Sequence, residues 1–199
     1  MTSGLLYILR SLMDLYLIAF ALRIAMQWVR SDFRNPVVQF VLTVTNPVVL
    51  PLRRLVPAVG KIDLAAVVGY FVLLFAFSLI LINLGCQTAP GIPAMLAVAA
   101  LRGVYLLLSV YLFLVFAYVI MSWITMGGSG YNPSLAAISN LLSGLVQPVL
   151  APFRRFIPPI GGFDLSPIAL LLIIGALRET IFSFTVQFST MGCNAAMVL

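Results

Sequence analysis

The sequence contains no histidine and only two cysteines in 199 residues. Without histidine, the chain cannot use imidazole acid–base catalysis, the usual zinc sites or histidine-ligated haem. Two cysteines are too few for a thiolate metal site. The chain also lacks a phosphate-binding loop and a nucleophile beside a base. We therefore expect a protein that is not an enzyme and that binds no metal ion and no cofactor.

Charge is equally scarce. Charged residues make up 8% of the chain and hydrophobic residues 63%, whereas a soluble domain carries about 25% charged residues. This composition predicts a membrane protein. The net charge of +6 then indicates membrane orientation and contact with anionic lipid rather than nucleic-acid binding. Residues 1–4 lack the basic start of a signal peptide, so we expect the first span to be retained.

What the chain does have is an internal repeat, since residues 46–64 resemble residues 147–165. Six residues of the first copy recur in the second at a constant offset of 101: Pro51, Arg53, Arg54, Pro57, Gly60 and Asp63 become Pro152, Arg154, Arg155, Pro158, Gly161 and Asp164. Each copy lies between two apolar stretches. The chain is therefore a tandem duplication of one unit, in which a basic, Pro-rich connector joins two spans.

The repeat predicts an all-α membrane protein with four transmembrane helices, arranged as two parallel-repeat hairpins. The first unit, residues 1–90, has spans at about 5–28 and 64–84 around connector 29–63. The second unit, residues 91–199, has spans at about 104–124 and 165–188 around connector 125–164. Residues 92–101 form either a short extra helix or an extension of the next span.

Each connector should contain an amphipathic helix that lies in the membrane interface. Asn35-Pro36 and Asn132-Pro133 are typical helix starts. Val37, Phe40, Val41 and Val44 then share one face of the first connector helix. Because proline interrupts helices, we expect Pro47, Pro51 and Pro57 to break it, and the connector not to cross the membrane.

Basic residues gather in the two connectors, which by the positive-inside rule lie in the cytoplasm, with both termini outside. Arg23, Gln27 and Arg30 form a stripe near Trp28 and resemble an interfacial anchor.

These connectors resemble those of the YggT family of integral membrane proteins. The shared pattern is [Asn/Gln]-Pro-Val-x-x-Pro-x-Arg-Arg-x-x-Pro-x-x-Gly-x-x-Asp-Leu, and it occurs in both units. The resemblance implies a multi-pass protein of the bacterial cytoplasmic (inner) membrane. It also implies links to osmotic stress and potassium uptake, to cell division and, in plastids, to maturation of a cytochrome complex, but it implies no single reaction.

Several residues are candidate sites. The basic connector residues could bind anionic lipid or a partner, or could simply set topology: Arg53, Arg54, Lys61, Arg154 and Arg155. Asp63 and Asp164 precede long helices and are expected to cap them, and each could pair with an arginine of its own unit. Cys86 and Cys193 follow the last span of their units, where a disulfide and two free thiols are both compatible with the sequence.

Four ionisable residues interrupt the spans: Arg10, Asp14, Arg178 and Glu179. Arg10 and Asp14 share a helix face. Asp14 and Arg178 should both lie about 15 Å deep, so we expect them to pair, with Arg10 near Glu179. Such a group either fixes how the units dock or belongs to a transport pathway.

Two hypotheses for function follow. The first is a non-enzymatic membrane scaffold or assembly factor, whose basic connectors contact anionic lipid head groups or a partner complex. The alternative is a small transporter or channel-like protein for ions or osmolytes, which would work as a homo-oligomer because four spans are few for a carrier.

Overall fold

The computed structural model describes residues 2–57, 63–85, 91–126, 132–156 and 164–188. Across these ranges it contains six helices and no strand, which confirms the all-α prediction. The helices are α1 (Thr2–Trp28), α2 (Pro36–Arg53), α3 (Leu64–Gly85), α4 (Ile92–Met126), α5 (Pro133–Phe156) and α6 (Ser166–Phe188).

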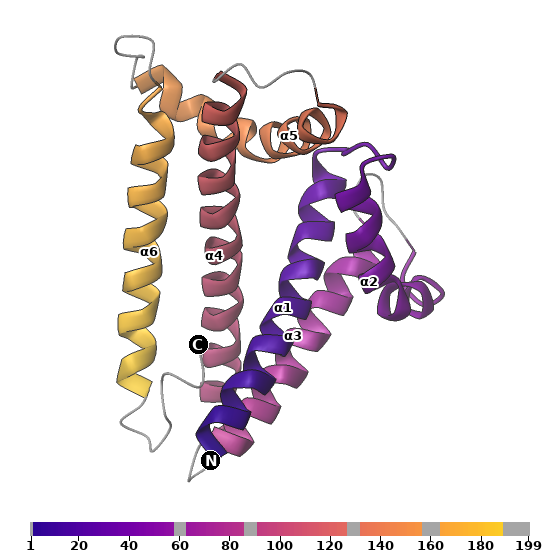
Figure 1. Ribbon diagram of the computed structural model, residues 1–199. Helices are drawn as coiled ribbons and strands as arrows, with labels where there is room; N and C mark the ends of the chain where they lie inside the picture. The colour runs from indigo at the N-terminus through magenta and orange to yellow at the C-terminus, as the bar shows by residue number, and fades with distance from the viewer. Residues whose placement is uncertain (1, 58–62, 86–90, 127–131, 157–163, 189–199) are drawn as a thin grey trace.

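The two repeat units form two helical hairpins that stand side by side (Figure 1). Helix α1 packs against α3, and α4 packs against α6. Helices α1 and α4 run in the same direction, so the two units have the same orientation. Each connector leaves its hairpin at the same end of the molecule, where α5 lies across the ends of α4 and α6.

The connector helices differ from the prediction of a break at proline. Helix α2 continues through Pro47 and Pro51, and α5 continues through Pro148 and Pro152. A proline inside a helix removes one backbone hydrogen bond. In each helix the two prolines are four residues apart and exposed, so both missing bonds lie on one outer face, away from the packed side.

Because α2 and α5 are continuous, six helices among the described residues, rather than the four expected spans, are long and apolar enough to cross a membrane. Helix α4 also settles the alternatives for residues 92–101, which extend the next span. It has 35 residues and is about 52 Å long, well above the ~30 Å of a bilayer core.

The amphipathic faces of the connector helices pack onto the protein's own spans. Helix α5 buries five apolar side chains: Leu141, Leu142, Leu145, Val146 and Leu150. Helix α2 buries Val38, Val41, Thr45 and Val49. The face predicted for α2 is confirmed in part: Val41 is buried and Val37 and Val44 are half-buried, but Phe40 is exposed and Thr45 is buried. The inner face is set by packing and by the polar contact that Thr45 makes, which hydrophobicity alone does not reveal.

Candidate functional site: two arginine–aspartate junctions and a buried ion pair

The end of each connector is tied to the start of the following helix by an arginine and an aspartate ten residues apart. In the first unit, Arg53 Nε donates to Asp63 Oδ2 at 3.1 Å, and Arg53 Nη2 contacts the same oxygen. In the second unit, Arg154 Nε donates to Asp164 Oδ2 at 2.7 Å. The repeated motif therefore builds the same ion pair twice.

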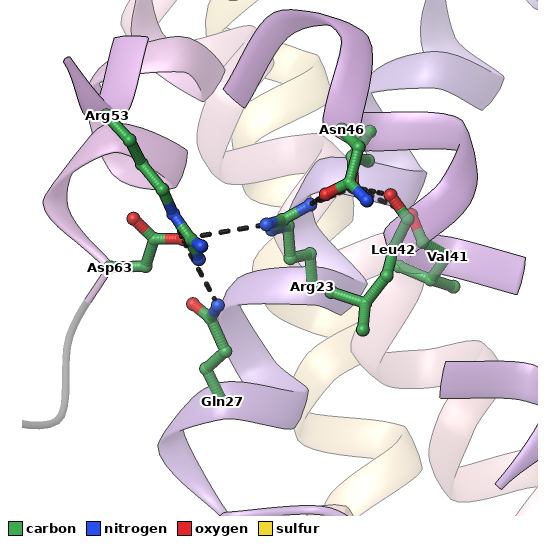
Figure 2. A network of polar contacts seen from close by, with 8 residues as sticks. Arg23, Gln27, Val41, Leu42, Asn46, Arg53 and Asp63 are labelled. Carbon is green, nitrogen blue, oxygen red and sulfur yellow. Dashed lines mark hydrogen bonds and ion pairs between the residues drawn. The ribbon is translucent and has the colours of Figure 1, made fainter. Parts of the chain in front are cut away.

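The first junction is extended into a buried network by Arg23 of α1 (Figure 2). Arg23 Nη1 donates to Thr45 Oγ1 at 2.6 Å and to Asn46 Oδ1 at 2.9 Å. Its Nη2 lies 3.6 Å from Asp63 Oδ2, to which Gln27 also donates at 3.3 Å. Arg23 thus joins three elements: α1, α2 and the start of α3.

This network corrects the expectation that Arg23 and Gln27 anchor α1 at the membrane interface. Both side chains point to Asp63 instead (Figure 2). Only 1% of the Arg23 side chain and 4% of the Asp63 side chain are exposed. Two arginines, Arg23 and Arg53, share one carboxylate, so the network carries one surplus positive charge.

The second junction lacks the buried arginine. The residue equivalent to Arg23, at the offset of 95 that relates Trp28 to Trp123, is Tyr118. Its hydroxyl accepts a hydrogen bond from Arg154 at 3.2 Å. Asp164 is 32% exposed, whereas Asp63 is 4% exposed. With one arginine for its one aspartate, the second junction is charge-balanced.

Asp164 and Asp63 contact the first residues of their helices through different groups. Asp164 Oδ1 accepts a hydrogen bond from the Ser166 backbone N–H at 2.9 Å, at the start of α6. Asp63 instead meets α3 with its backbone carbonyl, which accepts from Ala66 and Val67. The Asp63 carboxylate contacts Arg53 and Arg23 instead.

The pKa values of both carboxyls lie below their ordinary values. Burial opposes ionisation of Asp63, but hydrogen bonds from Arg53 and Gln27 and the charges of Arg53 and Arg23 more than offset it and lower its pKa. Burial likewise opposes ionisation of Asp164, and hydrogen bonds from Ser166 and Arg154 lower its pKa. Both aspartates are therefore charged at neutral pH.

The second arginine of each pair is exposed. The side chains of Arg54 and Arg155 form no hydrogen bond or ion pair with any residue that the structure describes. Each is followed by an exposed large apolar residue: Leu55 is 80% exposed and Phe156 is 85% exposed. We call Arg54–Leu55 and Arg155–Phe156 the two tips. Lys61, the remaining predicted binding residue, lies outside the described residues.

Within the helical region, Asp14 of α1 forms an ion pair with Arg102 of α4. Arg102 Nη2 donates to Asp14 Oδ1 at 2.5 Å, and Arg102 is fully buried. Arg10 lies on the other side of the carboxylate, with its Nε 3.4 Å from Oδ2. Arg102 Nη1 also reaches Ser78 of α3 at 3.5 Å. The pair thus joins the two units across α1, α3 and α4.

This geometry differs from the expected pairing of Asp14 with Arg178. Arg178 stays within its own unit, where it donates to the Tyr105 hydroxyl at 2.7 Å and lies 4.8 Å from the ring centroid. Glu179 is exposed on α6 and forms no ion pair with Arg10 or with any other described residue. Because α4 is longer than predicted, it brings Arg102 to the level of Asp14.

Sequence reasoning missed two functional candidates, Arg23 and Arg102. Arg102 was not among the candidate residues, although its position ten residues into a continuous α4 matches that of Asp14, twelve residues into α1. Arg23 carried one signal: it is a charged residue replaced by Tyr118 in the repeat. The predicted cysteine pair, Cys86 and Cys193, lies outside the described residues.

Comparison with known proteins agrees with the connector motif. The model of the CCB3/YggT family matches residues 2–84 and again residues 97–185. The chain belongs to the CCB3/YggT family. An uncharacterized YggT protein of Escherichia coli is 35% identical over 176 residues, which cover 86% of each chain. An uncharacterized protein of Pseudomonas aeruginosa is 37% identical over 175 residues, covering 87% of this chain and 86% of the relative.

A plant protein shares a shorter stretch with this chain. The Arabidopsis thaliana protein named YlmG homolog protein 2, chloroplastic, is 52% identical over 44 residues, which are 22% of this chain and 18% of that protein. No solved structure matches the chain. The two matched segments each contain one arginine–aspartate junction, so the junction is a feature of each YggT unit in this chain.

Proposed function

We propose that this YggT-family protein is a non-enzymatic membrane scaffold or assembly factor that binds an acidic partner complex through its two tips. The observation that carries the proposal is that the two arginines of each pair have different surroundings. Arg53 and Arg154 close the junctions, whereas Arg54 and Arg155 are exposed beside Leu55 and Phe156. A topology signal alone needs charge near the spans, but it does not need one arginine of each pair held in a fixed junction.

The chemistry of the tips fits a protein partner. An exposed guanidinium beside an exposed apolar side chain can bind a carboxylate and cover an apolar contact at the same time. The tips lie at the ends of two connectors that leave the hairpins on the same side (Figure 1). A partner could therefore contact both, and two weak contacts in one molecule raise overall affinity.

The proposed topology places four helices across the bacterial inner membrane: α1, α3, α4 and α6. Helices α2 and α5 lie at the cytoplasmic face, and both termini are outside. The distribution of arginines supports this orientation. Six arginines of the described residues belong to the connectors: Arg30, Arg34, Arg53, Arg54, Arg154 and Arg155.

The test is photocrosslinking in intact cells from a photoreactive amino acid at Leu55 or Phe156. We expect a discrete protein adduct from both positions, and we expect its loss when Arg54→Glu and Arg155→Glu are combined. A probe at Phe113, an exposed residue of α4 outside both connectors, is the control for random collisions. Adducts only to lipid, or only to a second copy of the chain, would contradict the scaffold.

Transport of ions or osmolytes by a homo-oligomer is the second candidate, and the buried Asp14–Arg102 pair is the observation that favours it. Ionisable groups at such depth often belong to ion or proton pathways. Arg102 Nε is buried without a hydrogen-bond partner among the described residues. The test is potassium flux after osmotic shock in cells that carry Asp14→Asn. Loss of flux with normal protein levels and unchanged tip adducts would favour transport.

A further inference from the structure

A polar cavity lies where the two units meet at the connector end. Its volume is about 480 Å³. One wall is the turn between α1 and α2, and the other is the first half of α5. The turn contributes Arg30, Ser31, Asp32 and Arg34, so the lining includes two arginines and one aspartate. Asp32 Oδ1 accepts from the Arg34 backbone N–H at 2.9 Å and so shapes the turn.

The backbone of this turn holds Arg30 in an unusual conformation. Its φ of 52° lies in the left-handed region, where glycine is the usual residue. The Arg30 N–H donates to the Gln27 carbonyl and the Ser31 N–H to the Met26 carbonyl, the pattern of a Schellman motif that ends α1. Glycine would fit the motif better, and backbone strain of this kind is concentrated at ligand sites.

An apolar groove adjoins the polar cavity. It has a volume of about 440 Å³ and is lined by α1, α3, α4 and α5. Val29 lines both spaces. Helix α5 also lines both, since Gly144 borders the polar cavity and Leu145 the groove. The two spaces are therefore neighbours and can serve as one site with a charged part and an apolar part.

We propose that this site binds one anionic phospholipid, with its phosphate between Arg30 and Arg34 and an acyl chain in the groove. This inference rests on the membrane topology of the proposed function. A groove between spans opens to acyl chains, and exposed Trp28 in its lining is typical of the level of the head groups. Guanidinium groups bind phosphate through paired hydrogen bonds. Ser31 Oγ is buried without a partner among the described residues and can donate as well.

The site is distinct from the tips, because neither Arg54 nor Arg155 lines the cavity or the groove. These two arginines are therefore matched controls: each substitution to glutamine removes the same charge from the same end of the molecule. Arg30→Gly is the sharpest test variant. It removes a guanidinium, but it should fold at least as well as the wild type because glycine suits a positive φ.

The experiment is native mass spectrometry of the purified chain with equal amounts of phosphatidylglycerol and phosphatidylcholine in mixed micelles. We expect one phosphatidylglycerol per chain, retained at least tenfold more than phosphatidylcholine. The double variant Arg30→Gly, Arg34→Gln should lose this preference at least tenfold, with no fall in unfolding temperature. The double variant Arg54→Gln, Arg155→Gln should keep it. An equal loss in both double variants, or in neither, would refute the site.

The apolar part has its own test. Val149 lines the groove and is exposed, so Val149→Trp should fill the groove and weaken phosphatidylglycerol retention several-fold. Val104→Trp, at an exposed position on α4 outside the lining, should not. Excess inorganic phosphate should not displace the lipid, and displacement would overturn the proposal in favour of a free-anion site. Crosslinking from the tips should be unaffected by these variants, because the tips line neither space. Failure of the scaffold proposal is therefore distinguishable from failure of the lipid site.

Discussion

Arg102 Nη2 donates a hydrogen bond to Asp14 Oδ1 across 2.5 Å, and this contact joins the two repeat units inside the helical bundle. Neither residue is matched by an arginine, lysine, aspartate or glutamate in the other unit: the residues at the offset of 95 are Tyr7 and Ser109. The pair therefore distinguishes the two copies. The pair fixes the position of α1 along α4. A purely apolar interface would specify this register less firmly.

Asp14→Asn should destabilise the chain by about 3 kcal/mol, because it leaves the fully buried Arg102 without a counter-charge. The measurement is denaturant unfolding in detergent micelles. Replacing both partners, with Asp14→Leu and Arg102→Met, should recover most of the loss. Arg10→Gln is the control, since Arg10 is partly exposed and should cost less than about 1 kcal/mol. If the double replacement is no better than Asp14→Asn alone, the pair does not act as a unit.

Gly103, beside Arg102, marks a close approach of α3 to α4. A Cβ at this position would lie 2.6 Å from Leu74 Cδ2, and Leu74 is itself buried. Gly103→Ala should therefore lower stability by about 1 kcal/mol through overpacking, and a smaller residue at Leu74 should relieve it. Gly175→Ala, where the added methyl group meets nothing within 4 Å, should be neutral or stabilising because alanine favours helix. Thermal unfolding of the two variants decides the point.

The tandem repeat, the helical class and the basic connectors could all be predicted from the sequence, because composition and duplication are visible in it. Proline made the connector helices look broken. That rule failed because Pro47 and Pro51 share one exposed face, as do Pro148 and Pro152, and only the three-dimensional packing reveals which face is outside.

The partners of the buried charges could not be predicted for a related reason. Asp14 was correctly placed inside a span, but its partner depends on how far α4 extends and on which helices are neighbours. Arg23 lies near Trp28 and resembles a residue that reaches toward the head groups. Its burial follows from Thr45 and Asn46 of α2, which come close only when the connector folds back on α1.

The two junctions should contribute unequally to stability. Asp63→Asn should cost roughly 3 kcal/mol, because it leaves the buried Arg23 uncompensated. Asp164→Asn should cost less than about 1 kcal/mol, because both Asp164 and Arg154 are solvent-accessible and solvent screens the pair. Denaturant unfolding in micelles measures both. Equal costs would mean that burial of the first junction is energetically unimportant.

The first junction should also make stability depend on acid pH. Ordinary aspartate has a pKa of about 3.9 in the unfolded chain, and the pKa of Asp63 is lower in the folded protein. Its stabilising contribution is therefore fully present above pH ~3.9 and is lost as the pH falls through the folded pKa. When the pH is lowered from about 5 to about 3, the unfolding temperature of Asp63→Asn should therefore fall less than that of the wild type. Parallel curves would contradict this role.

The central claim is that one arginine of each pair closes a junction while the other binds a partner. The most direct measurement compares Arg53→Gln and Arg154→Gln with Arg54→Gln and Arg155→Gln, recording both unfolding temperature and crosslinked adduct from the tips. We predict that Arg53→Gln and Arg154→Gln lower the unfolding temperature, and that Arg54→Gln and Arg155→Gln reduce the adduct while leaving the unfolding temperature unchanged. If Arg54→Gln and Arg155→Gln leave the adduct intact, or if they destabilise the fold as much as the other two, the claim is wrong.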